Sequence, residues 1–166
     1  KPKSNIEDLS IFENDEILNI LKPEIILVGL NISRDDLKNK GKFANFHSNY
    51  RYAQEYKLRF ALKDTPWWGG YLTDIIKNFP DINSGNVIKK LKENPQIEIK
   101  NITDFRQEII DLGSSNPIII ALGDATYKIL TKHFEEEFKV LKITHFSYRI
   151  GPEKYKQNVH QVLFQN

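Results

Sequence analysis

Short apolar runs alternate with segments of helical periodicity along most of this chain. Four of the runs predict strands, namely Glu24–Val28, Tyr71–Ile76, Pro117–Leu122 and Lys139–Thr144. In the first and third of them every residue after the first is apolar, as in strands buried on both faces of a sheet. Apolar residues at three- and four-residue spacing predict helices at Glu13–Leu21, Tyr50–Leu62, from Ser84 through Leu91, Thr103–Leu112, Asp124–Lys132 and Pro152–Leu163.

Strands separated by helices predict a parallel sheet that helices cover on both faces. The expected fold is therefore α/β, a three-layer α/β/α sandwich with a central four-stranded parallel sheet. Thr103 is expected to cap the helix that runs to Leu112, with positions 105, 109, 110 and 112 in one apolar stripe. The polar segment Ser33–Asn49 is expected to be a long loop. No internal repeat, low-complexity tract or Gly/Ser-rich linker divides the chain, so residues 1–166 are expected to form a single domain.

Polar residues follow the predicted strands, at Gly29–Ser33, Thr73-Asp74, Gly123-Asp124 and His145–Ser147. Ligands of parallel sheets bind beyond the carboxyl ends of the strands, so this chemistry is expected to converge on one edge. Asn31 presents an amide with donors and an acceptor after the sharp turn that Gly29 permits. Ser147 and Arg149 are suited to hold a phosphate. From these residues alone, an ordinary turn at Gly29 and a structural hydrogen-bonding role for His145 remain open.

The composition excludes several kinds of catalytic site. The chain has no cysteine, which excludes a disulfide scaffold, a thiolate nucleophile and a zinc site built on sulfur. It contains no G-x-S-x-G nucleophile turn, no G-x-G-x-x-G segment and no G-x-x-x-x-G-K-[ST] phosphate loop. The four histidines, at positions 47, 133, 145 and 160, lack metal-ligand spacing. Catalysis by a bound metal is therefore not expected.

Basic and aromatic residues are concentrated in one part of the chain. The net charge is only +2, but eight Lys/Arg stand against four acidic residues between Arg34 and Asp64. Nine of the nineteen aromatic residues lie between Phe43 and Tyr71. Basic groups interleaved with rings form the stacking and phosphate-contacting surfaces of nucleic-acid-binding proteins. A solvated helix that buries its aromatic residues in the core has the same composition, so this alternative stays open.

No segment has the pattern of a membrane span or a secretory signal. The longest apolar runs, Ile25–Val28 and Ile118–Leu122, are far shorter than the roughly 20 residues that cross a bilayer. The first five residues are not followed by the apolar h-region of a signal peptide. We expect no membrane partner and a cytoplasmic location. Because the sequence has no clear dimer seam, we also expect a monomer.

Five segments of the chain form an ordered series. They are Gly29–Ser33, Gly41–Phe43, Gly70–Lys77, Ile118–Gly123 and Thr144–Tyr148. This series resembles the motifs of the uracil-DNA glycosylase superfamily. That superfamily carries an early G-x-N-P-G or G-E-A-P-G loop, an aromatic residue in a G-x-P-F segment, a strand ending in T-N-x-x-K, an apolar strand closing in L-G and a late H-P-S loop. The similarity spans about residues 24–165 and implies a four-stranded parallel sheet between helices.

The resemblance implies an enzyme that flips a nucleotide out of the stack and hydrolyses its N-glycosidic bond. By resemblance, Asn31 positions the attacking water on the anomeric carbon of the sugar. His145, as a neutral imidazole, donates a hydrogen bond to the charge on the departing base. Phe43 stacks on that base, with Phe46 as the competing candidate. This work is orientation and electrostatic stabilisation, which implies DNA, single- or double-stranded, as partner and no cofactor.

The late loop is implied to hold the DNA backbone. By resemblance, Ser147 and the loop backbone grip the phosphate beside the flipped nucleotide, and Tyr148 or Arg149 enters the duplex or its groove. Ser33 of the early loop is grouped with these phosphate or groove contacts. It also leaves out a bulky tyrosine with which some relatives exclude 5-substituted bases, so larger pyrimidines are not excluded.

The chain departs from the family pattern in both loops and at Asp74. The early loop lacks its proline and ends in Ser33, and Phe146 stands where the late loop usually has proline. Asp74 occupies the slot of the asparagine that reads the base. An ionised Asp74 only accepts hydrogen bonds and suits a base with an exocyclic amine, whereas a protonated Asp74 mimics asparagine and suits uracil. A catalytically inactive nucleic-acid-binding protein of this fold and a nucleoside- or nucleotide-binding protein are the alternatives.

Overall fold

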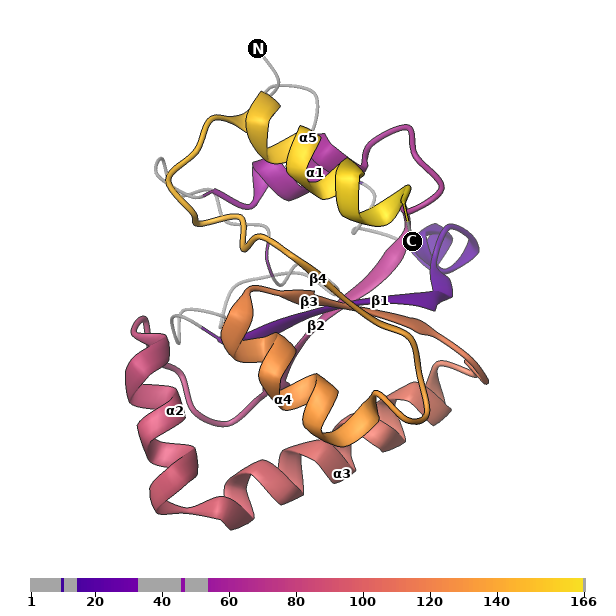
Figure 1. Ribbon diagram of the computed structural model, residues 1–166. Helices are drawn as coiled ribbons and strands as arrows, with labels where there is room; N and C mark the ends of the chain where they lie inside the picture. The colour runs from indigo at the N-terminus through magenta and orange to yellow at the C-terminus, as the bar shows by residue number, and fades with distance from the viewer. Residues whose placement is uncertain (1–9, 11–14, 33–45, 47–53, 166) are drawn as a thin grey trace.

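Four parallel strands form the central sheet of this protein. The computed structural model describes residues 10, 15–32, 46 and 54–165. The strands are β1 (Lys22–Asn31), β2 (Gly70–Ile76), β3 (Ile118–Leu122) and β4 (Val140–Ile143). They lie in the order β2-β1-β3-β4, and each adjacent pair is parallel (Figure 1). The predicted four-stranded parallel sheet is confirmed.

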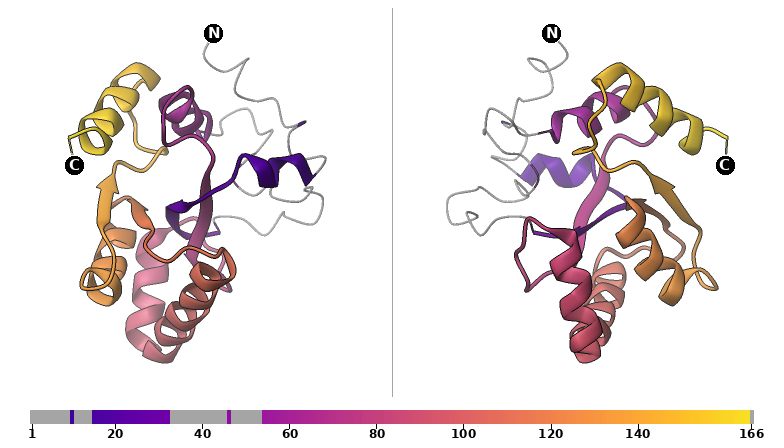
Figure 2. Two further views of the ribbon diagram at one scale, coloured as in Figure 1. Left: turned by 90° about the vertical axis from the view of Figure 1, so that its right-hand side faces the viewer. Right: turned by 60° about the vertical axis from the view of Figure 1, so that its left-hand side comes forward.

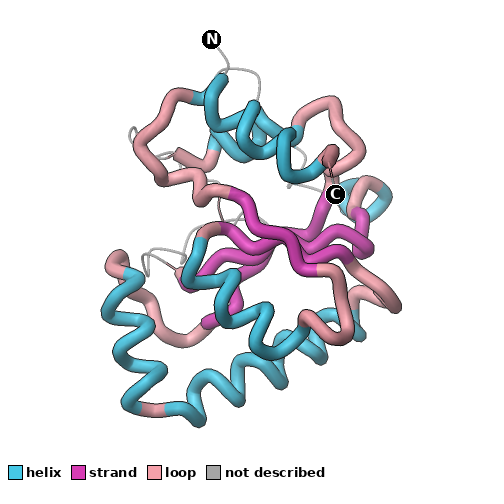
Figure 3. The backbone as a smooth tube through the Cα atoms, in the orientation of Figure 1, coloured by secondary structure: helices cyan, strands magenta, loops and turns pink. Residues whose placement is uncertain are grey.

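Helices cover both faces of the sheet, as the sequence predicts. One face is covered by α1 (Tyr56–Leu62) and α5 (Pro152–Leu163), and the other by α2 (Ser84–Glu93), α3 (Pro95–Asp111) and α4 (Asp124–Phe134) (Figures 1 and 3). Seen from the side, the strands lie between these two helical layers (Figure 2). The fold is therefore an α/β sandwich of three layers.

The position of β1 in the middle of the sheet explains its continuous apolar sequence. Ile26 and Val28 belong to the core on the side of α2, α3 and α4. Ile25 and Leu27 belong to the core on the side of α1 and α5. Successive side chains of a strand point to opposite faces, so a strand between two helical layers needs apolar residues at consecutive positions. Gly29 comes next on the α1/α5 face, where it meets the site described below.

Thr103 does not cap a helix, contrary to the prediction, but lies inside α3. The helix begins at Pro95, a residue favoured in the first turn, and continues to Asp111. Thr103 lies in its middle, where the hydroxyl donates to the carbonyl oxygen of Ile99 at 3.1 Å. The prediction was wrong because a hydroxyl that is satisfied inside a helix gives the same sequence signal as one that caps it. Ile110, expected in the apolar stripe, is 65% exposed.

The other predicted helices are present with shifted ends. The segment predicted as a helix at 13–21 contains a short 3-10 helix, η2 (Asp15–Asn19). α1 begins at Tyr56, and residues 50–53 of the predicted helix lie outside the described residues. Most of the predicted loop at 33–49 also lies outside them, with Phe46 as the exception.

Within the described part of the chain, no helix is long and apolar enough to cross a membrane.

Candidate active site at the carboxyl ends of the strands

The candidate site lies where the strand order reverses. The chain passes from β1 to β2 on one side and then returns to β3 on the other side of β1. Such a switch point leaves a crevice outside the carboxyl ends of the strands, which is the usual ligand position in open parallel sheets. Asn31 is the last residue of β1, and His145 follows the end of β4 by two residues. Both catalytic candidates therefore lie at the expected edge.

The strand register brings Asn31 and His145 close together along this edge. Val28 pairs with Ala121, and Ala121 pairs with Lys142. Asn31 lies three residues beyond Val28, and His145 lies three residues beyond Lys142. Adjacent strands of a sheet lie about 4.8 Å apart, so β1 and β4, two positions apart, are separated by about 10 Å where they are paired through β3. Asn31 and His145 therefore extend from the same edge of the sheet.

Asp74, Gly29 and Phe46 meet on the α1/α5 face of this edge. Asp74 and Gly29 are register partners on β2 and β1. A Cβ atom built on Gly29 would overlap Oδ1 of Asp74 and would lie 3.5 Å from Cε1 of Phe46. The lack of a side chain at position 29 therefore lets the Asp74 carboxyl lie against the backbone of β1. Phe46 has a backbone φ of 68°, which is uncommon for a bulky residue, and its side chain packs against the α1/α5 core.

The carboxyl of Asp74 is buried and unpartnered. The residue is 4% exposed, and neither carboxyl oxygen has a hydrogen-bond partner among the described residues. Burial raises the pKa of Asp74 to about 7, while the charge of Lys77 lowers this pKa and the charge of Glu108 raises it. At neutral pH a large share of the molecules therefore carries a protonated Asp74. A buried carboxyl without a hydrogen-bond partner among the described residues is a candidate to bind the polar edge of a ligand.

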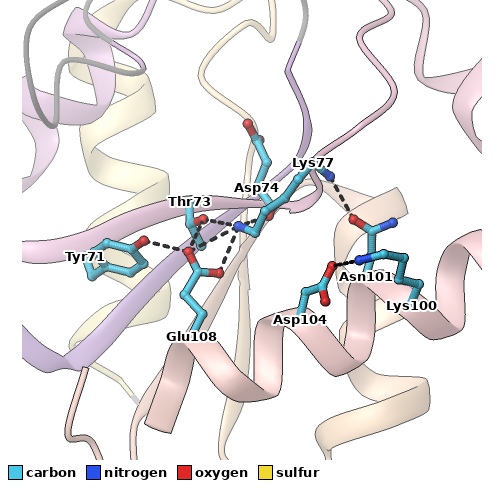
Figure 4. Close-up of polar contacts among 8 residues, drawn as sticks. All are labelled: Tyr71, Thr73, Asp74, Lys77, Lys100, Asn101, Asp104 and Glu108. Atoms are coloured by element: carbon cyan, nitrogen blue, oxygen red, sulfur yellow. Dashed lines mark hydrogen bonds and ion pairs between the residues drawn. The ribbon is translucent and has the colours of Figure 1, made fainter. Parts of the chain in front are cut away.

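Glu108 of α3 anchors β2 from the opposite face of the sheet. Its Oε1 accepts hydrogen bonds from the hydroxyls of Tyr71 at 2.6 Å and Thr73 at 3.0 Å. The Lys77 ammonium lies 2.8 Å from Oε2 of Glu108 and donates to the backbone oxygen of Asp74 at 2.9 Å. Figure 4 shows the Asp74 carboxyl directed away from this network. The network therefore holds β2 in place without using the carboxyl that faces the site.

His145 is held as a neutral imidazole. The backbone N–H of Ser147 donates to Nδ1 at 3.2 Å, and the Ser147 hydroxyl lies 2.7 Å from the same nitrogen. A backbone N–H only donates, so Nδ1 carries no proton and the neutral ring carries its hydrogen on Nε2. Burial and, next, the positive charge of Lys57 lower the pKa of His145 to about 4. Nε2–H has no partner among the described residues and is the donor that the ring offers to a ligand.

Asn31 offers the acceptor end of its amide. Nδ2 donates to three backbone carbonyl oxygens, those of Ile32 at 2.9 Å, Phe79 at 3.1 Å and Asp81 at 2.9 Å. Three acceptors around one atom establish which end of the amide carries the hydrogens. Oδ1 accepts no hydrogen bond from the described residues, and the side chain is half-buried. The donors therefore bind Ile32 and the loop after β2, and no described residue occupies Oδ1.

The remaining candidates of the late loop lie beside His145. Tyr148 is 62% exposed, and Arg149 is also exposed, so both side chains are accessible to a large ligand. The hydroxyl of Ser147 bonds to His145, a role that the sequence alone does not indicate. Phe43 and Ser33 lie outside the described residues. Phe46 and Asp74 thus lie together against Gly29, while Asn31 and the late loop lie at the same carboxyl edge of the sheet.

Two residues of the site carry little signal in the sequence. From the sequence, Gly29 is expected to permit a sharp turn, whereas in the structure it lies within β1 and makes room for Asp74. Lys57 lies in a helix, where lysine is usually exposed. In the structure it is 1% exposed and lies beneath the late loop. Both roles depend on contacts between segments that are far apart in the chain.

Replacing Gly29 by alanine is expected to destabilise the protein by about 1–3 kcal/mol, because the new methyl group overlaps a buried carboxyl. Urea denaturation measures this loss. Gly151→Ala is the control for loss of a glycine without an overlap, since a Cβ atom at Gly151 meets no atom within 4 Å. Because Gly151 is the N-cap of α5, where glycine is preferred to alanine, its cost should stay below about 1 kcal/mol. Equal losses in the two variants would show that the contact between Gly29 and Asp74 is not tight.

No match to this chain is found among protein-family models, curated proteins or solved structures. The function of the site is therefore argued from its own residues. Within the described ranges, no group of three or more His, Cys, Asp or Glu side chains is arranged to hold a metal ion.

Proposed function

We propose that this chain is a DNA N-glycosylase that releases a uracil-type base. The observation that carries the proposal is the tautomer of His145, because Nδ1 accepts from Ser147 and Nε2–H is the remaining donor. A preorganised N–H donor stabilises negative charge that develops on a departing base. The resemblance of five sequence segments to the uracil-DNA glycosylase superfamily supports the same function.

In the proposed reaction Asn31 binds the attacking water and His145 binds the departing base. The bond between the base nitrogen and the anomeric carbon breaks, and a water oxygen forms a new bond to that carbon. The base takes the bonding electrons and leaves as an anion, to which Nε2–H of His145 donates a hydrogen bond. Oδ1 of Asn31 accepts a hydrogen bond from the attacking water. That water gives up a proton to solvent as its bond forms, and the released base anion takes up a proton.

Asp74 reads the base in its protonated form. A neutral carboxyl has one O–H donor and one C=O acceptor, so it pairs with O4 and N3–H of a uracil-type base at once. Burial raises the pKa of Asp74 to about 7, so this form is populated at neutral pH. The ionised carboxyl has only acceptors, which suit a base that carries an exocyclic amine. The protonation state of Asp74 therefore sets the base preference.

Aromatic and basic side chains near the site favour a base within a nucleic acid over a free nucleoside. Phe46 lies against the same point of β1 as the Asp74 carboxyl, which suits it to stack on the base. Tyr148 and Arg149 are exposed beside His145. A ring that stacks and a guanidinium that binds phosphate are the groups a strand of DNA requires.

The proposal is tested with oligonucleotides that carry uracil, hypoxanthine or a modified cytosine. We expect alkali-labile abasic sites at uracil at pH 7 or below, and loss of this product in Asn31→Ala with DNA binding kept. Salt-sensitive DNA binding without an abasic product on any base would instead support a catalytically inactive binding protein. Failure to bind DNA even at low salt would contradict both functions and favour a nucleoside ligand, which calorimetry with free nucleosides tests directly.

A further inference from the structure

Lys57 of α1 is a buried lysine without a carboxylate partner among the described residues. It is 1% exposed. Its ammonium donates to the backbone oxygens of Tyr148 at 2.8 Å and Ile150 at 3.3 Å. It also lies 5.7 Å from the centre of the Tyr155 ring of α5. Burial of an ammonium is costly and lowers the pKa of Lys57, so its contacts with these carbonyls call for an explanation beyond stability.

The two carbonyl oxygens belong to the turn that carries His145. Within residues 145–150, the N–H of Tyr148 donates to the oxygen of His145 at 3.0 Å, and the N–H of Ile150 donates to the oxygen of Tyr148 at 2.8 Å. Lys57 therefore joins this turn to α1 at two points. Because Ser147 of the same turn holds Nδ1 of His145, any displacement of the turn changes the direction of Nε2–H.

We propose that Lys57 is a positioning residue for His145, whose buried ammonium clamps the 145–150 turn to α1 and places a fixed positive charge at the turn that carries the imidazole. The effect of Lys57 on catalysis rests on the proposed function. The link between α1 and the 145–150 turn rests only on the two hydrogen bonds of Lys57. The negative charge develops on the base that accepts from Nε2–H, and the positive ammonium attracts it. This stabilisation of the base anion grows as the base departs.

The surroundings of His145 make Lys57 the source of this field. Lys57 is the one charged group, among the described residues, that acts on the pKa of His145. The neighbours of His145 that the described part of the chain provides are uncharged: Ser147 at Nδ1, the Phe146 ring at a centroid distance of 4.2 Å, and Gly123, where a built Cβ would lie 3.4 Å from Cβ of His145. A nearby positive charge disfavours protonation of the imidazole. Burial is the larger cause of the lowered pKa of His145, and the charge of Lys57 adds to it in keeping the imidazole neutral.

The experiment is a nitrogen NMR titration of the imidazoles in the full chain, with His145 assigned by its absence in His145→Gln. In the wild type we expect the Nε2–H tautomer and a midpoint well below 6.5. Lys57→Met should raise this midpoint by about half a pKa unit or more and should speed amide hydrogen exchange at residues 146–150 by about tenfold. Lys156→Met is the matched control, since Lys156 lies 5.0 Å from the centre of the Phe60 ring and makes no hydrogen bond or ion pair with residues 145–150.

An unchanged midpoint and unchanged exchange in a folded Lys57→Met would overturn the inference. Lys57→Gln keeps a hydrogen-bond donor and removes the charge, so its midpoint decides the role of the charge even where Lys57→Met fails to fold. A raised midpoint supports the inference, and a midpoint equal to that of the wild type overturns it. These readouts need no catalysis, so a shift in the variants combined with no abasic product in the wild type would retain the clamp and reject the proposed function.

Discussion

Replacing His145 by alanine lowers the rate constant of uracil release by about 100- to 1000-fold, if Nε2–H is the donor to the departing base. This is the loss expected on removal of one preorganised donor from a developing anion. DNA binding should change little, because the donor is used most strongly as charge develops. Single-turnover measurements with enzyme in excess over a uracil-containing oligonucleotide give the rate constant, and fluorescence anisotropy gives Kd.

Ser147→Ala is the matched control for this prediction. It removes the hydroxyl that lies 2.7 Å from Nδ1 of His145, whereas the backbone N–H at 3.2 Å remains and preserves the tautomer. We expect a loss of less than about tenfold, as for one exposed hydrogen bond. A His145→Ala variant with the wild-type rate constant would contradict the role of His145 in the reaction.

Replacing Asp74 by asparagine is expected to remove an alkaline decline of activity on uracil. Burial raises the pKa of Asp74 to about 7, so the protonated form becomes about tenfold rarer with each pH unit above that value. An asparagine amide offers its donor and acceptor at every pH. At pH 9 the variant should therefore release uracil about 100-fold faster than the wild type, and at pH 5 the two should agree within a few-fold. Single-turnover rates from pH 5 to pH 9 check this.

Two outcomes would contradict this reading of Asp74. Parallel pH profiles for the wild type and Asp74→Asn would show that the carboxyl does not read the base. Wild-type activity that rises with pH on a base with an exocyclic amine would show that the ionised form does the reading. Asp104→Asn is the control, because the Asp104 carboxylate is ion-paired with Lys100 on the exposed side of α3 and should leave the profile unchanged.

The stability of Asp74→Asn gives an independent measurement of the pKa of Asp74. The pKa of Asp74 is raised on folding from 3.8 to about 7, so its favourable contribution is complete below pH 3.8 and is lost as the pH rises through about 7. Between pH 5 and pH 8 the free energy of unfolding of the wild type should fall by about 2–3 kcal/mol relative to Asp74→Asn. Urea denaturation at the two pH values measures the difference. A parallel change in both proteins would mean that Asp74 titrates at its ordinary pKa.

The sheet was predictable because its strands are marked by their own residues. A central parallel strand is buried on both faces, and the run Ile25–Val28 shows this without reference to any other segment. Helix ends were less predictable. Thr103 has the chemistry of an N-cap, but its hydroxyl bonds to Ile99 within α3, and only the helix around it distinguishes the two uses.

The position of the candidate residues at the carboxyl edge was predictable from the chain alone, because Asn31, Asp74 and His145 each lie in a segment that ends a strand or directly follows one. Their chemical states could not be found in that way. Desolvation on burial and the contacts and charges of other segments set these states. They decide whether Asp74 is protonated, which nitrogen of His145 donates and where the charge of Lys57 acts. Lys57, for example, contacts a carbonyl 91 positions further along the chain. Sequence periodicity reports which face of an element is apolar, whereas a pKa depends on everything that folding brings within a few ångströms of the group.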